Sequence, residues 1–138
     1  LISRNPLQIS NGVKHLQDEI FELNGKLAIL YADYFERKYE ESQAGDLYIS
    51  FEEGCTMDML RRFIDRMAER SKIACGLLKK AEDEYQYVII SHSEMLKPYA
   101  KKLNEKLSGR GGGSDEMLQG SFKANEELIR AVLKETFC

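Results

Sequence analysis

Apolar residues recur with heptad spacing through the first quarter of the chain. From Ile9 to Tyr34 the intervals alternate between four and three residues, which is typical of a helix that packs lengthwise on another helix. The members of this seam are Ile9, Val13, Leu16, Ile20, Leu23, Leu27, Leu30 and Tyr34. The spacing predicts one long helix that ends near residues 42–45, where Gly45 can take a left-handed terminating conformation.

A second seam begins after Thr56. Threonine is a good N-cap residue, and Asp58 would lie favourably in the first turn of the helix that follows. The seam consists of Leu60, Ile64, Met67, Ser71, Ala74, Leu78, Ala81, Tyr85 and Val88. It predicts a second long helix that ends near Ile90 and forms a hairpin with the first. Residues 46–55 are then an ordered connection between the two helices.

Two features predict a break after the second seam. Ser91 and Glu94 have the spacing of a capping box, and Pro98 lacks a backbone donor. A third helix then continues to about Ser108. The alternative is a single kinked helix over residues 57–108, because the apolar spacing stays in phase across the break.

Residues 109–114 are rich in glycine and predict a flexible linker, which is either engineered or native. A last helix begins at Ser114 or Ser121. Its apolar face consists of Leu118, Phe122, Leu128, Ile129, Val132, Leu133 and Phe137. The predicted fold is therefore an all-α antiparallel helical bundle of about four helices, built on a long coiled-coil-like helical hairpin, in a single domain over residues 1–138.

Composition excludes several classes of protein. The chain has 138 residues, of which 43% are hydrophobic and 31% are charged, and no apolar run approaches the ~18 residues of a membrane span. Three cysteines, Cys55, Cys75 and Cys138, are too few and too widely spaced for a disulfide framework. These observations predict an intracellular, cytoplasmic location.

No residue pattern indicates catalysis. Metal sites in helical bundles use Glu-x-x-His, but Gly12 and Ile89 stand three residues before His15 and His92. Cys75 is interpreted as a small packing residue, and the glycine run lacks the pattern of a phosphate-binding loop. We therefore expect no enzymatic activity, cofactor, metal or small-molecule substrate.

Charge is distributed unevenly along the chain. Residues 1–54 contain 5 basic and 10 acidic residues, whereas residues 55–138 contain 15 and 13. A basic stripe recurs at helical spacing in the second part and consists of Lys97, Lys101, Lys102, Lys106 and Arg110. It suggests a peripheral module that binds anionic membrane through residues 97–110. Nucleic acid is not an expected partner, because the stripe lacks interleaved aromatic residues and a groove-reading motif.

The favoured function is a non-catalytic protein–protein interaction module, a scaffold or adaptor fragment of a larger intracellular protein. Its helices carry more apolar surface than one seam needs, so we expect it to bind a partner helix or to self-associate. The residues predicted to form this partner-helix or core interface are Leu118, Phe122, Ile129, Val132 and Phe137. Membrane binding is the alternative function.

Overall fold

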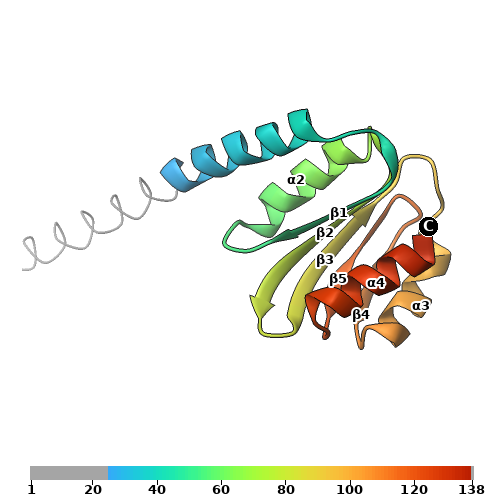
Figure 1. The fold of residues 1–138 in the computed structure, drawn as a ribbon. Helices are drawn as coiled ribbons and strands as arrows, with labels where there is room; N and C mark the ends of the chain where they lie inside the picture. The colour runs from blue at the N-terminus through green and yellow to red at the C-terminus, as the bar shows by residue number, and fades with distance from the viewer. Residues whose placement is uncertain (1–24, 138) are drawn as a thin grey trace, which may run out of the picture.

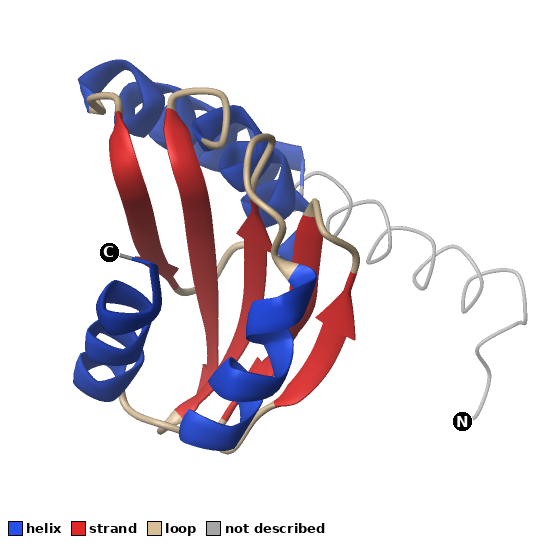
Figure 2. Ribbon diagram, turned by 90° about the vertical axis from the view of Figure 1, so that its right-hand side faces the viewer, coloured by secondary structure: helices blue, strands red, loops and turns tan. Residues whose placement is uncertain are grey.

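The computed structural model describes residues 25–137 and shows a mixed α/β fold. A five-stranded sheet carries helices on both faces (Figures 1 and 2). The strand order is β1-β2-β3-β5-β4, with β1 parallel to β2 and every other pair antiparallel. The strands are β1 (Gly45–Glu52), β2 (Ser71–Ala81), β3 (Glu84–Ile90), β4 (Arg110–Gly113) and β5 (Met117–Phe122). The predicted all-α bundle is therefore wrong.

The helices form two layers around the sheet. One face is covered by a helix over residues 25–41 and by α2 (Met57–Met67). The other face is covered by the short 3-10 helix η1 (Lys97–Tyr99), by α3 (Ala100–Lys106) and by α4 (Glu126–Phe137). Figure 1 shows the helix of residues 25–41 beside α2, and α3 beside α4 on the opposite side.

Side-chain alternation along the strands divides the core into two parts. Successive residues of a strand point to opposite faces of the sheet. Ile73 and Leu77 of β2 accordingly pack toward α3 and α4, whereas Ala74 and Leu78 pack toward α2. Because β2 lies between two other strands and under helices on both faces, residues 73–78 are all buried.

The second predicted helix is correct only in its first part. Thr56 is the N-cap of α2, and its hydroxyl accepts a hydrogen bond from the backbone N–H of Met59 (3.2 Å). The helix ends at Met67, and the rest of the predicted seam forms the antiparallel hairpin of β2 and β3. A strand buried on both faces is a nearly continuous apolar run, so helical spacing can be traced through it by coincidence.

The first predicted helix ends where expected, at residue 41, although its part over residues 9–24 lies outside the described residues. The described part of its seam does not pack as one side of a helical hairpin, because Leu27 and Leu30 are 42% and 67% exposed. Phe35 is buried instead and stacks on Phe63 of α2. The predicted connection over residues 46–55 also proved wrong in part, since most of it is strand β1, which pairs with β2.

The last third of the chain contains two further corrections. The predicted break before Pro98 is confirmed, so the single kinked helix is wrong. The predicted linker over residues 109–114 is largely strand β4. The last helix begins only at Glu126, after Asn125, whose side-chain oxygen accepts a hydrogen bond from the backbone N–H of Leu128 (2.8 Å).

Candidate functional site

Strand β4 is an edge strand with three consecutive glycines. Gly111 and Gly113 have φ angles of +147° and +157°, which L-residues with side chains rarely adopt. A Cβ on Gly111 would lie 2.4 Å from the carbonyl oxygen of Gln119, and one on Gly113 would lie 2.1 Å from that of Met117. The pairing of β4 with β5 therefore requires both glycines.

Gly112 lies between them but is not required in the same way. A Cβ on Gly112 would have no heavy atom within 4 Å. Packing inside the protein therefore does not explain the glycine at this position. A bare backbone is useful where a ligand or another backbone approaches closely.

Helix α3 borders β4, and a shallow surface hollow of about 540 Å³ lies between them. The hollow is lined by Lys97, Ala100, Lys101, Asn104, Glu105, Gly109, Gly111, Gly112 and Gly113. Asn104 fixes the spacing of its two sides. The side-chain Nδ2 of Asn104 donates to the carbonyl oxygen of Gly111 (3.0 Å), and its backbone carbonyl accepts from the N–H of Gly109 (2.9 Å).

The backbone of β4 contributes polar groups to the same border. In an antiparallel ladder, alternate residues of an edge strand direct their N–H and C=O groups away from the partner strand. The hydrogen bond from the Asn104 side chain to the carbonyl oxygen of Gly111 shows that the polar backbone groups of Gly111 point away from β5. Gly113 lies two positions later in the ladder, so its backbone groups point the same way. Outward backbone N–H groups beside lysines make a surface that suits an anion.

The five residues of the predicted basic stripe do not form one continuous surface in the structure. Lys97 and Lys101 line the hollow beside β4, whereas Lys102 is exposed on α3 outside its lining. Lys106 pairs with a glutamate of α4 (3.1 Å). Arg110 begins β4 and lines a different hollow. The structure thus places two of the five cations in the lining of the hollow between α3 and β4.

The five residues predicted as a partner-helix or core interface lie at one hydrophobic cluster. Leu118 and Phe122 belong to β5, and Ile129 and Val132 belong to α4. All four are buried in the cluster between the sheet and the helices, and Phe137 packs against it, partly buried.

A buried polar cluster joins the helix of residues 25–41 to β1. The Glu52 carboxylate, whose side chain is 5% exposed, pairs with Lys38 and accepts hydrogen bonds from the hydroxyls of Tyr34 (2.9 Å) and Ser50 (2.7 Å). Burial lowers the pKa of Lys38, but the hydrogen bond to Glu52 and nearby negative charge outweigh it, so that pKa is raised. Burial raises the pKa of Tyr34. The mutual pairing of these groups makes the cluster an anchor for the helix, which sequence patterns did not indicate.

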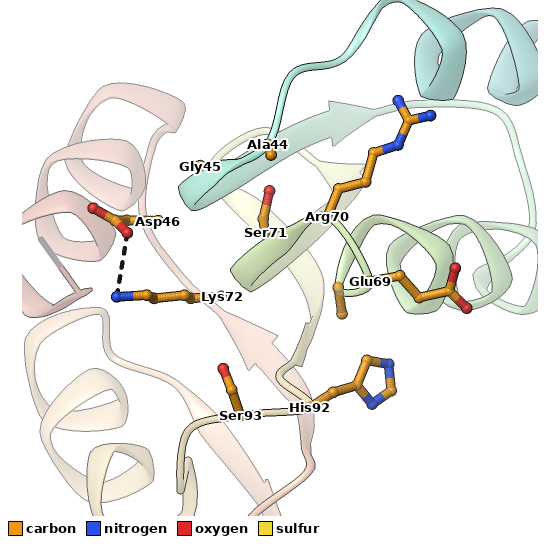
Figure 3. Close-up of a pocket in the computed structure, with 10 residues that line it drawn as sticks. Ala44, Gly45, Asp46, Glu69, Arg70, Ser71, Lys72, His92 and Ser93 are labelled. Atoms are coloured by element: carbon orange, nitrogen blue, oxygen red, sulfur yellow. Dashed lines mark ion pairs between the residues drawn. The ribbon is translucent and has the colours of Figure 1, made fainter.

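A larger hollow of about 850 Å³ lies beside the first residues of β1 and β2 (Figure 3). Four of its five ionisable side chains, all except Glu69, have partners among the described residues. Lys72 pairs with Asp46 (3.5 Å), and His92 pairs with an aspartate of α2 (3.2 Å). The guanidinium of Arg70 points away from the Lys72–Asp46 pair in Figure 3 and donates to the carbonyl oxygen of Ser42 (3.2 Å). This hollow is therefore a weaker ligand candidate than the one beside β4.

Two other kinds of site can be assessed over residues 25–137. In that part of the chain, no group of three or more His, Cys, Asp or Glu side chains could hold a metal ion. None of the helices described there has both the length and the apolar character that crossing a membrane requires.

Comparison with solved structures reveals a likeness in fold to a domain of a known protein. The fold is similar to the C-Ala domain from Aquifex aeolicus alanyl-tRNA synthetase, with a TM-score of 0.54 and 26% sequence identity. The match covers 70% of this chain and 96% of that domain. No protein-family model and no curated protein matches the sequence.

This likeness corrects two predictions made from the sequence. The neighbour supports the mixed α/β architecture, so the helical-bundle and coiled-coil descriptions are wrong. The neighbour is also part of an enzyme named for tRNA, which contradicts the prediction that nucleic acid is not an expected partner. That prediction failed because it required aromatic residues, whereas glycine backbone and lysines can contact a phosphate chain without them.

Proposed function

We propose that this chain is a non-catalytic RNA-binding domain that binds tRNA through β4 and the adjoining end of α3. The observation that carries the proposal is Gly112, an edge-strand glycine that no packing contact requires. It lies beside Lys97 and Lys101 at a common hollow. The likeness to a domain of an alanyl-tRNA synthetase supports the choice of RNA as the ligand.

The proposed mechanism is recognition of the sugar–phosphate backbone. Lysine side chains that neutralise phosphates release condensed counterions, which supplies much of the affinity of such complexes. Backbone N–H groups also donate to phosphate oxygens and set the orientation of the bound chain. At β4, Lys97 and Lys101 would supply the charge, and the glycine backbone would let the RNA approach closely.

Charge along the chain is consistent with this assignment. Although the whole chain has a formal net charge of −3, residues 55–138 contain two more basic than acidic residues. The excess of acidic residues therefore lies before α2, away in sequence from the proposed site. Within the lining of the hollow, Glu105 is the single acidic residue against two lysines.

Replacing Gly112 with valine is the experiment that tests this proposal. We expect Gly112→Val to weaken tRNA binding about tenfold, comparable to the loss of one hydrogen bond to a charged group, because the side chain would hold the RNA away from β4. The affinity is measured by fluorescence anisotropy with a labelled tRNA. The melting temperature should stay unchanged, since a Cβ at this position has no heavy atom within 4 Å.

Gly45→Val is the matched control, because a Cβ on Gly45 also has no heavy atom within 4 Å and Gly45 lies at the start of β1. This variant should bind tRNA as the unmodified chain does. Equal affinities for the Gly112 and Gly45 variants would contradict the proposed role of β4.

A protein-interaction role also stays a prediction. The observation that favours it is the exposure of Ile29 and Leu30, which are 71% and 67% exposed on the helix of residues 25–41.

A further inference from the structure

A third hollow lies on the opposite face of the sheet from α3. Its volume is about 370 Å³, and it is lined by Met57, Arg61, Gln86, Tyr87, Arg110, Gln119, Gly120 and Ser121. Three of its polar residues lie side by side across the strands, since Ser121 of β5 pairs with Gln86 of β3 and with Arg110 of β4. Gln119, two positions before Ser121, points to the same face.

The hollow marks the place where α2 ceases to cover the sheet. Val88 and Ile90 of β3 are buried beneath the helices of that face. Farther along the face the side chains become polar, and Gln119 is exposed. A sheet face with polar side chains in neighbouring strands is one that faces solvent. The β4 edge is therefore accessible from this side as well as from the side of α3.

Two arginines lie on this face, and one of them, Arg110, supplies a positive charge without an ion-pair partner among the described residues. The Arg61 guanidinium is held by Asp58 (2.9 Å) and by the side-chain oxygen of Gln119 (3.3 Å), and its side chain is 38% exposed. Its buried Nε atom has no hydrogen-bond partner among the described residues. Arg110 is exposed and has no ion pair within residues 25–137. Guanidinium groups bind phosphate oxygens through two parallel hydrogen bonds, which lysine cannot do.

We propose that Arg61 and Arg110 form a second phosphate-binding site for the same RNA, which crosses the β4 edge at Gly112. This inference rests on the proposed function and extends it by assigning a path to the ligand. Lys97 and Lys101 hold the RNA backbone on the α3 side, and the two arginines hold the next part of the backbone on the open sheet face. Gly112 lies between the two sites, and its missing side chain leaves the crossing point clear.

The first test replaces Arg110 with glutamine. We expect Arg110→Gln to weaken tRNA binding roughly fivefold. The plot of the logarithm of the association constant K against the logarithm of the salt concentration should become less steep by about 0.7–0.9, the value of one phosphate contact. Arg110→Lys should keep the salt slope, because the positive charge remains. It should lose part of the affinity, because lysine cannot form the two parallel hydrogen bonds that a guanidinium makes with phosphate. Fluorescence anisotropy across a salt series measures both quantities.

Arg37→Gln is the matched control, because Arg37 lies on the helix of residues 25–41 and is 72% exposed. It removes the same charge from the chain and should leave the slope unchanged. If the Arg110 and Arg37 variants bind equally, the second site is wrong while the proposed function stands. If the unmodified chain fails to bind tRNA, the proposed function itself is wrong.

A second variant tests the same site without removing an arginine. Gln119→Glu changes one atom type and places a carboxylate beside Arg61 at an exposed position of β5. The negative charge should repel phosphate and weaken tRNA binding at least as much as Arg110→Gln does. An unchanged affinity in this variant, with an unchanged melting temperature, would overturn the assignment of this face.

Discussion

Replacing Lys38 with methionine is expected to lower the free energy of unfolding by about 3 kcal/mol, in the range found when one partner of a buried ion pair is removed. The side chain of Glu52 is 5% exposed, and Lys38 is the cation that it pairs with. Without Lys38, the carboxylate remains in a site that water scarcely reaches. Urea denaturation followed by circular dichroism measures the change.

The double variant Lys38→Met with Glu52→Leu provides the control. Replacing both members of a buried pair with apolar groups of similar size is often neutral, so the double variant should recover most of the lost stability. A single variant that is as stable as the unmodified chain, or a double variant less stable than the single one, would show that this cluster does not anchor the helix to β1.

The same ion pair predicts a pH dependence. Because the pKa of Lys38 is raised in the folded protein, its contribution to stability is fully present below the ordinary lysine pKa. That contribution is lost as the pH rises through the raised value. The unmodified chain should therefore lose stability in strongly alkaline solution relative to the double variant, which lacks both groups.

The largest effect on RNA binding is expected from the lysines beside β4. Changing Lys97 and Lys101 together to glutamate should weaken tRNA binding roughly a hundredfold, because two phosphate contacts become repulsions. Both side chains are exposed and line the hollow, so the fold should be retained. The measurement is the dissociation constant at fixed salt, with circular dichroism as the check on folding.

Lys102 and Lys106 provide a control on the same helix. Changing both to glutamate alters the net charge by the same amount, but neither lysine lines the hollow, and Lys106 is paired with Glu135 of α4. We expect a loss about ten times smaller for this variant. Equal losses for the two pairs would mean that overall charge, rather than the site at β4, governs binding.

Local helix signals were predictable from the sequence because they depend on neighbouring residues. The cap at Thr56, the break before Pro98 and the end of the first helix at residue 41 all follow from short-range hydrogen bonding and backbone restriction. These signals place boundaries between elements. They do not determine whether the apolar segment between two boundaries is a helix or a strand.

The sheet was missed because its central strands lack a readable period. Residues 73–78 are buried on both faces, so their apolar run fits a helical seam as well as a strand. Leu118 and Phe122 are four residues apart, which suits one face of a helix and equally one face of β5. The aromatic and β-branched run over residues 85–90 was the available signal for a strand.

The candidate site was half predictable. Lys97 and Lys101 belong to a basic stripe that is visible in the sequence. The glycines at 111–113 were interpreted as a linker, since glycine carries no side-chain pattern that would distinguish an edge strand from a flexible segment. Arg61 of α2 and Arg110 of β4 lie far apart in the chain. The packing of α2 on the sheet, together with the pairing of β3, β5 and β4, brings them to one face.

The most direct test of the central claim is the affinity of the whole chain for a purified tRNA, measured from about 50 to about 200 mM salt. Binding through Lys97, Lys101, Arg61 and Arg110 would involve roughly four phosphate contacts, so log K should fall against log salt with a slope of about −3. Absence of binding at the lowest salt, or an affinity that salt does not change, would contradict the assignment of this fold as an RNA-binding domain.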